Sequence, residues 1–198
     1  MNVVLADQER LELLTKRDFA GESTVYCVKL LYNFVVSRNC KTLLELGVRS
    51  GVSTRAFLLG CKVTGGHLWS VDISEIRVPN IHFGDDWGLS EFWTFTQHMN
   101  DLDYEWDKPL DLLFIDTSHT YEQTLAELNK FTPYVKRNGI VLLHDSLLDG
   151  VEGWGVLRAI KTFLSENPHW DYYETKVEGE LGVLTRTHPF ALLYGEQK

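Results

Sequence analysis

Hydrophobic runs alternate with amphipathic segments along most of this chain. Near-continuous apolar runs predict buried strands at 42–46, 67–71, 110–115 and 139–143. Apolar residues at helical spacing predict helices at 8–17, 25–37, 53–59, 89–99, 121–131 and 156–164. Weaker patterns predict short strands at 80–83, 170–174 and 181–185. Strands that alternate with helices indicate the α/β class, with a parallel sheet covered on both faces.

The length of the chain fits one domain. Its 198 residues are enough to bury a core without a disulfide or a structural metal. We expect a single domain over residues 1–198, in which 1–40 form a helical cover and 41–186 form the core. Ligands of such sheets bind outside the carboxyl ends of the strands. Those strand ends are therefore where candidate chemistry is expected.

Composition narrows the classes of partner. The net charge of −9 argues against a non-specific nucleic-acid binder, which needs a basic face. No apolar stretch approaches the roughly 18 residues that span a bilayer, so no membrane partner is expected. Three widely spaced cysteines and an N-terminus without a signal-peptide pattern predict a cytoplasmic protein. A small-molecule partner fits these features, and a homodimer is compatible with them.

The turn after the first core strand has the form Glu45-x-Gly47-x-x-x-Gly51 and opens a helix. It lacks the GxGxxG pattern, whose second glycine lets the backbone approach a pyrophosphate. Free N–H groups at the start of the helix, together with the Ser53 hydroxyl, are suited to a carboxylate, and Glu45 to an ammonium group. A structural turn is the plainer alternative. The pattern favours a ligand that carries no pyrophosphate.

Acidic residues follow the other strands as well. Asp72, at the end of the next strand, can accept both hydroxyls of a ribose. Asp85 follows the short strand predicted at 80–83 and is placed to accept from an adenine amino group, with Trp87 beside it. Acids also serve simply to keep loops soluble, and for any one of them that is the better interpretation. Their repetition at one predicted edge favours a nucleoside site.

The segments Asp111-Leu-Leu-Phe-Ile-Asp116-Thr-Ser-His119-Thr-Tyr121 and Asn138-Gly-Ile-Val-Leu-Leu-His144-Asp145 complete the pattern. With the loop at Glu45, they resemble class I S-adenosylmethionine-dependent methyltransferases over about residues 25–186. The likeness is greatest to macrocin O-methyltransferases and cephalosporin-hydroxylase-like proteins, and more distant to caffeoyl-CoA and catechol O-methyltransferases. The resemblance implies a Rossmann-like three-layer sandwich whose mostly parallel seven-stranded sheet has its last strand antiparallel.

The resemblance also implies S-adenosylmethionine at Glu45, Gly47, Gly51, Ser53, Asp72, Asp85, Trp87 and Asp116. It further implies a divalent metal, usually magnesium, held by Asp116 and Asp145. His144 stands where macrocin-type enzymes have Glu, and Ser146 stands where catechol-type enzymes have Asn. Because an imidazole ligand at His144 favours a softer metal than magnesium, or no metal at all, the third ligand stays open.

The expected reaction is methyl transfer to a hydroxyl of a small molecule, such as a sugar or natural product. His119, three residues after Asp116, is the candidate general base, and His144 is the second candidate. A loop or cap residue is the plainer interpretation of His119. Residues 150–155, with Trp154, form either a flap over the site or a plain loop. The alternatives to a methyltransferase are a nicotinamide-dependent oxidoreductase and a non-catalytic binding protein of the same fold.

Overall fold

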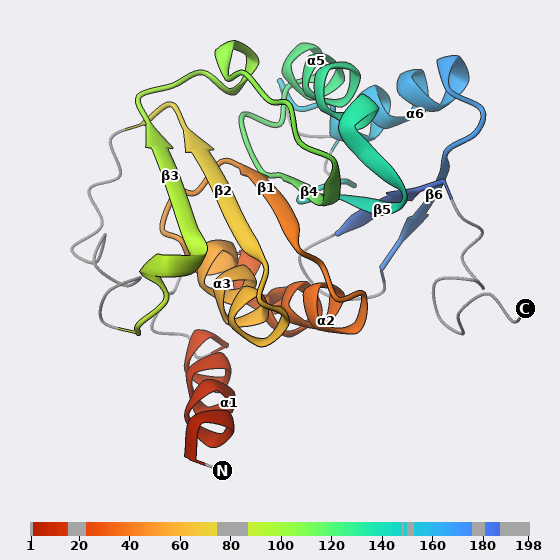
Figure 1. Ribbon diagram of the computed structural model, residues 1–198. Coiled ribbons are helices and arrows are strands. Elements are labelled where there is room, and N and C mark those ends of the chain that lie inside the picture. The colour runs from red at the N-terminus through yellow and green to blue at the C-terminus, as the bar shows by residue number, and fades with distance from the viewer. Residues whose placement is uncertain are drawn as a thin grey trace, which may run out of the picture.

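A seven-stranded sheet forms the centre of the computed structural model, which describes residues 2–15, 23–74, 87–147, 149, 153–175 and 181–186 (Figure 1). The strand order is β3-β2-β1-β4-β5-β7-β6. The strands are β1 (Thr42–Leu46), β2 (His67–Asp72), β3 (Trp93–Gln97), β4 (Leu110–Ile115), β5 (Val135–Leu143), β6 (Asp171–Glu174) and β7 (Gly182–Thr185). Pairing is parallel from β3 through β5, and β7 is antiparallel to both of its neighbours. The predicted mostly parallel sheet with an antiparallel last strand is confirmed.

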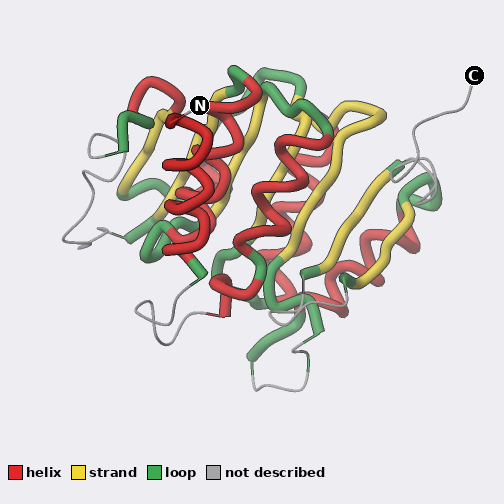
Figure 2. Tube along the Cα trace, turned by 90° about the horizontal axis from the view of Figure 1, so that it is seen from below, coloured by secondary structure: helices red, strands yellow, loops and turns green. Residues whose placement is uncertain are grey.

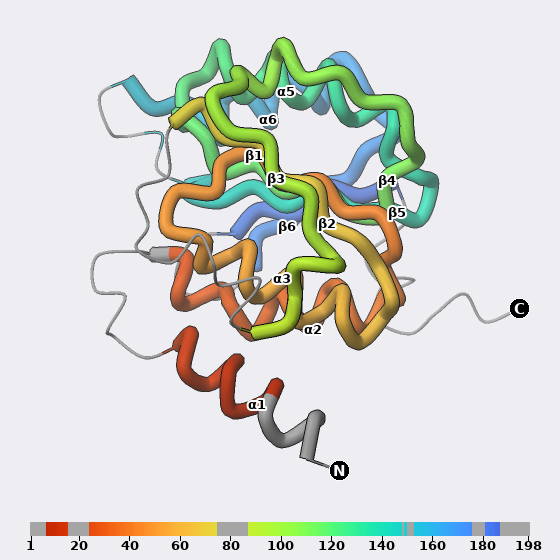
Figure 3. The backbone as a smooth tube through the Cα atoms, turned by 60° about the vertical axis from the view of Figure 1, so that its left-hand side comes forward, coloured from red at the N-terminus to blue at the C-terminus, as the bar shows by residue number. Residues whose placement is uncertain are grey.

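Helices cover both faces of this sheet. Helices α2 (Val28–Ser37) and α3 (Val52–Thr64) lie on one face, and α5 (Tyr121–Phe131) and α6 (Val156–Glu166) lie on the other (Figures 1 and 3). Viewed at right angles to Figure 1, the helices again lie against the strands (Figure 2). Within β1, Leu43 packs into the core beneath α3, whereas Leu44 and Leu46 pack into the core beneath α5 and α6. Period-two alternation of large apolar residues therefore fills two cores and explains the near-continuous apolar strands.

Helix α1 (Asn2–Leu14) packs against α3 at the edge of the molecule. The Lys62 ammonium lies 2.9 Å from the nearly buried Asp7 carboxylate, which also pairs with Arg10 at 3.5 Å. A 3₁₀ turn at Ser23–Tyr26 leads into α2, close to the helix expected from residue 25. Among the described residues, no helix is long and apolar enough to cross a membrane.

The helix predicted at 89–99 is wrong. A single 3₁₀ turn at Ser90–Phe92 leads directly into β3, which pairs with β2 from Trp93 opposite Leu68 to Gln97 opposite Asp72. Trp93 and Phe95 stack with their ring centroids 5.0 Å apart, as side chains two residues apart on a strand can. Aromatic and β-branched residues at successive positions favour strand over helix, and pairing with β2 decides the outcome. The strand predicted at 80–83 lies outside the described residues.

Candidate active site

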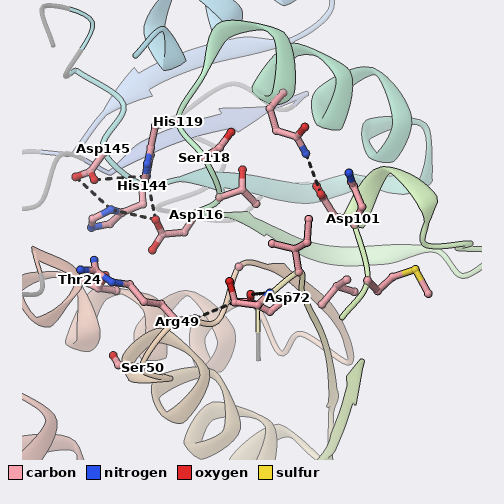
Figure 4. Close-up of a pocket in the computed structure, with 18 of the residues that line it drawn as sticks. Thr24, Arg49, Ser50, Asp72, Asp101, Asp116, Ser118, His119, His144 and Asp145 are labelled. Atoms are coloured by element: carbon pink, nitrogen blue, oxygen red, sulfur yellow. Dashed lines mark hydrogen bonds and ion pairs between the residues drawn. The ribbon is translucent and has the colours of Figure 1, made fainter. Parts of the chain in front are cut away.

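A cavity of about 920 Å³ opens at the carboxyl ends of the parallel strands. Its walls come from the segments that follow β1, β2, β3, β4 and β5, together with Thr24 near the N-terminus and Trp154 before α6 (Figure 4). The volume is typical of a site for a cofactor-sized ligand. The position agrees with the strand-end rule used to select candidate residues.

The loop after β1 approaches the end of β4 very closely. Gly47 has a φ of +87°, and a Cβ placed there would lie 2.0 Å from the backbone oxygen of Asp116. Both the backbone conformation and the space therefore require glycine. Arg49, also in the cavity wall, has a φ of 49°. Asp72 holds this loop, since its Oδ2 accepts hydrogen bonds from the amides of Val48 at 2.8 Å and Arg49 at 3.0 Å.

Glu45 and Ser53 lie beneath the loop and outside the cavity wall, so the direct ligand contacts expected of them are not what the geometry shows. Ser53 and Thr54, in the first turn of α3, donate hydrogen bonds to the Glu45 carboxylate at 2.7 and 2.8 Å, and Ser70 on β2 donates at 2.7 Å. Burial raises the pKa of Glu45 to about 7, against the lowering effect of these hydrogen bonds. Because Glu45 faces inward, it braces β1, β2 and α3 beneath the loop.

Of the other residues predicted to bind the cofactor, some line the cavity and others do not. Asp72 lines the cavity as expected. Gly51, with a φ of +73°, caps the start of α3 without lining the cavity. Trp87 is not in the cavity wall: the Arg10 guanidinium lies 5.4 Å from its ring centroid, on the side of α1. Asp85 lies outside the described residues, and it precedes β3 in the chain, whereas the prediction placed it after the third strand.

Residues after β3 supply a wall that sequence reasoning missed. Met99, Asn100 and Asp101 line the cavity, and Gln123 from α5 donates through its Nε2 to Asp101 Oδ1 at 2.8 Å. The same amide lies 3.0 Å from Glu127, whose pKa is raised well above its usual value by burial and by Asp101. The period-two pattern at 93–97 was the available signal, because it sets where the third strand ends.

At the other end of the cavity, four side chains meet (Figure 4). His119 Nε2 lies 3.1 Å from Asp116 Oδ1 and 3.5 Å from Asp145 Oδ2. His144 Nδ1 lies 3.2 Å from Asp145 Oδ1 and 3.6 Å from Asp116 Oδ1. The structure thus gathers the predicted catalytic and metal residues from the ends of β4 and β5. We call Asp116, His119, His144 and Asp145 the His–Asp cluster.

Electrostatics inside the His–Asp cluster favours charge separation. Burial acts to lower the pKa of His144, but contacts with Asp145 and Cys27 and the charge of Asp116 raise it to about 10. Burial acts to raise the pKa of Asp116, yet the hydrogen bond with His119 and the nearby positive groups hold it below its usual value. The cluster therefore stabilises positive charge beside ionised carboxylates, which is what either a proton or a cation would require.

Backbone strain and stacking fix His119 in place. His119 has a φ of 60° and Asp145 a φ of 51°, in the left-handed region that is costly for residues other than glycine. The indole of Trp154 stacks on the His119 ring, with centroids 4.7 Å apart and planes at 18°. The amide of Gly155 donates to the His119 carbonyl at 2.9 Å. Trp154 therefore belongs to the cavity wall and restrains the His119 ring.

The chain thus combines a mostly parallel α/β sheet, a cofactor-sized cavity over the first strand–helix turn and a His–Asp cluster at one end of that cavity. Residues 44–146, slightly more than half of the chain, match the family described as a methyltransferase domain, and the chain belongs to that family. No curated protein sequence matches the chain.

Several solved structures with the same fold are named as methyltransferases, and their sequence identity to this chain is low. The SAH-bound methyltransferase PaMTH1 from Podospora anserina is 16% identical, with a TM-score of 0.69 over 95% of this chain and 89% of that chain. The O-methyltransferase from Bacillus cereus in complex with SAH is 14% identical, with a TM-score of 0.65 over 91% and 90%. The O-methyltransferase TomG from Streptomyces achromogenes, in complex with SAM, is 14% identical, with a TM-score of 0.63 over 90% and 89%. The predicted Rossmann-like methyltransferase fold is confirmed.

Proposed function

We propose that this chain transfers a methyl group from S-adenosylmethionine to a hydroxyl of a small molecule. One observation carries the proposal: a single cavity joins Asp72 and Asp101, which suit a nucleoside, to the His–Asp cluster, which suits a reacting hydroxyl. The family to which the chain belongs and the SAH or SAM named with its structural neighbours support the choice of cofactor.

The cofactor would lie along the wall formed by the ends of β1, β2 and β3. Asp72 Oδ2 accepts from the two loop amides and Oδ1 accepts from the Ser74 amide at 2.7 Å, which leaves a lone pair of Oδ1 that can accept from a ribose hydroxyl. Asp101 takes the place proposed for Asp85, since it follows the third strand and lines the cavity. The methionyl carboxylate would meet the part of the wall formed by Gly47, Arg49 and Ser50, in the loop before α3.

In the reaction, the acceptor oxygen forms a bond to the methyl carbon as the carbon–sulfur bond breaks, which leaves a thioether. The hydroxyl proton must move to a base. His119 is the first candidate, because its side chain is 17% exposed at the cavity wall, whereas that of His144 is 2% exposed. Asp116 would hold the imidazolium that forms, through the 3.1 Å contact with Nε2.

The acceptor would be a small metabolite, such as a sugar or natural product, in the part of the cavity beside Trp154 and His119. An aromatic face such as that of Trp154 suits the C–H groups of a sugar or a flat ring. The net charge of −9 disfavours a nucleic-acid acceptor. A cytoplasmic location accords with the availability of such metabolites.

Thermal-shift titration with S-adenosylhomocysteine and, separately, with NAD⁺ tests the proposal. A ligand that binds only the folded protein, present at a hundred times its Kd, adds about 2.7 kcal/mol to the free energy of unfolding. We expect S-adenosylhomocysteine to raise the Tm of the wild type, and to raise that of Asp72→Ala much less. Stabilisation by NAD⁺ alone would instead indicate the nicotinamide-dependent oxidoreductase, and stabilisation by neither ligand would contradict the proposed cofactor site.

A further inference from the structure

The His–Asp cluster has a donor set that does not fit magnesium. Among the described residues, one ligand atom each from Asp116, His119 and His144 lies within 4.8 Å of the others, and this is the one group of three or more potential ligands found there. The sequence had suggested Asp116, Asp145 and His144, with His119 left aside as a base. The structure brings both imidazoles to the same point. Mg²⁺ prefers oxygen ligands, whereas imidazole suits Zn²⁺, Fe²⁺ and Co²⁺.

We propose that Asp116, His119 and His144, with Asp145 beside them, form a site for a divalent first-row transition ion that discriminates against magnesium. Only the role given to the bound ion rests on the methyltransferase function proposed above. The binding of the ion does not depend on that function. When bound, such an ion would lower the pKa of the acceptor hydroxyl. His119 would then serve as a ligand, and the base role proposed for it would apply only to protein without the ion.

The separations between the donor atoms are those of ligands around one ion. Ion–nitrogen and ion–oxygen distances of about 2.0–2.2 Å place neighbouring ligand atoms about 3.0–3.5 Å apart. The pairs that join the two histidines to the two aspartates are 3.1, 3.2, 3.5 and 3.6 Å apart. Two carboxylates with two neutral imidazoles would also balance the charge of a divalent ion.

The state of His144 is an independent observation that points to a ligand. Its side chain is 2% exposed, and although Asp145 Oδ1 lies 3.2 Å from Nδ1 and the Cys27 thiol also contacts the ring, neither ring nitrogen makes a hydrogen bond of normal geometry within the described residues. Buried polar atoms without such a bond are rare and call for a partner. His144 lines the cavity and lies beside Asp116, so an ion at the cluster would supply that partner.

The ring of His119 is restrained in the orientation that a ligand needs. Trp154 stacks on one face of the ring, and Nε2 is directed at the two carboxylates. Two strand ends and one loop therefore hold the side chains of the site in place. Such preorganisation is typical of binding sites rather than of chance surface clusters.

Isothermal titration calorimetry of chelator-treated protein with Zn²⁺, Co²⁺ and Mg²⁺ tests the proposal. We expect Zn²⁺ and Co²⁺ to bind at one equivalent, and Mg²⁺ to bind at least about 100-fold more weakly. His119→Ala and His144→Ala should each weaken Zn²⁺ binding at least about tenfold. His169→Ala is the matched control, since His169 is exposed and outside the cavity wall, and it should leave Zn²⁺ binding unchanged.

A second variant keeps the test decisive where alanine impairs folding. His119→Asp places an oxygen ligand at a position whose φ of 60° aspartate, like histidine, adopts more readily than most residues other than glycine do. It should shift the preference of the site from Zn²⁺ towards Mg²⁺, a change that loss of structure would not produce. The visible absorption of bound Co²⁺ should change with it, because its bands depend on the ligand set.

Three outcomes would overturn the proposal: no ion binds, Mg²⁺ binds as tightly as Zn²⁺, or Zn²⁺ binding is unaffected by both alanine variants. Titration of the same chelator-treated protein with S-adenosylhomocysteine separates this failure from failure of the proposed function. Binding of S-adenosylhomocysteine without ion binding would refute only the metal site.

Discussion

Replacing Gly47 with alanine tests whether the cavity depends on close contact between the loop after β1 and the end of β4. The added Cβ would lie 2.0 Å from the backbone oxygen of Asp116, a full 1.0 Å below the 3.0 Å limit of real Cβ contacts. Since the obstructing atom belongs to the backbone, a rotamer change cannot relieve the clash. Asp116 and the loop must therefore move apart.

Gly65→Ala provides the matched control, because Gly65 has a φ of +65° but no atom within 4 Å of its added Cβ. The left-handed conformation alone should lower the free energy of unfolding by about 1–2 kcal/mol in both variants. Overpacking adds about 1–3 kcal/mol in Gly47→Ala, for a total loss of about 2–5 kcal/mol. Displacement of the loop should also weaken S-adenosylhomocysteine binding at least about tenfold. Urea denaturation and calorimetry measure the two effects. Equal destabilisation by the two variants, with full ligand affinity in Gly47→Ala, would refute the reasoning.

Four further predictions concern buried and cavity-lining acids. Because the folded-state pKa of Glu45 is raised from 4.5 to about 7, its ionisation costs stability as pH rises from 4.5 to 7, by about 3 kcal/mol in total. Urea denaturation should show this decline in the wild type and not in Glu45→Gln, and a parallel decline in the variant would contradict it. The raised pKa of Glu127 has the same sign, so Glu127→Gln should gain stability relative to wild type at pH 8 compared with pH 5. Asp101→Asn removes the carboxylate that opposes ionisation of Glu127, and should lower the pKa of Glu127 measured by NMR; an unchanged value would show that burial alone sets it. Asp72→Ala should weaken S-adenosylhomocysteine binding about tenfold or more by calorimetry, with the Gly65→Ala protein as reference.

Sequence patterns predicted the parts of this fold that have strong local signals. The apolar strands at β1, β4 and β5 were predicted because burial on both faces leaves few polar positions. The segment at β3 was not, since Trp93 and Phe95 suit either an apolar helical face or a strand, and only pairing with β2 decides between them. Because the strand was predicted as a helix, Met99, Asn100 and Asp101 at its end were not predicted as site residues.

The sequence also does not predict the direction in which a side chain of the site points. The order Glu45-x-Gly47 marks a ligand loop, but it does not show that the Glu45 carboxylate turns inward to Ser53, Thr54 and Ser70. In contrast, the offset of three residues between Asp116 and His119 was a usable signal, since both follow one strand end. The sequence does not predict that His119 and His144 lie close together, because only the pairing of β4 with β5 brings them there.

The structure of the protein in complex with S-adenosylhomocysteine is the most direct test of the proposed function. The account predicts ribose oxygens against Asp72, adenine beside Asn100 and Asp101, and the sulfur directed at the His–Asp cluster. A ligand bound elsewhere, or one whose sulfur points away from Asp116 and His119, would contradict it.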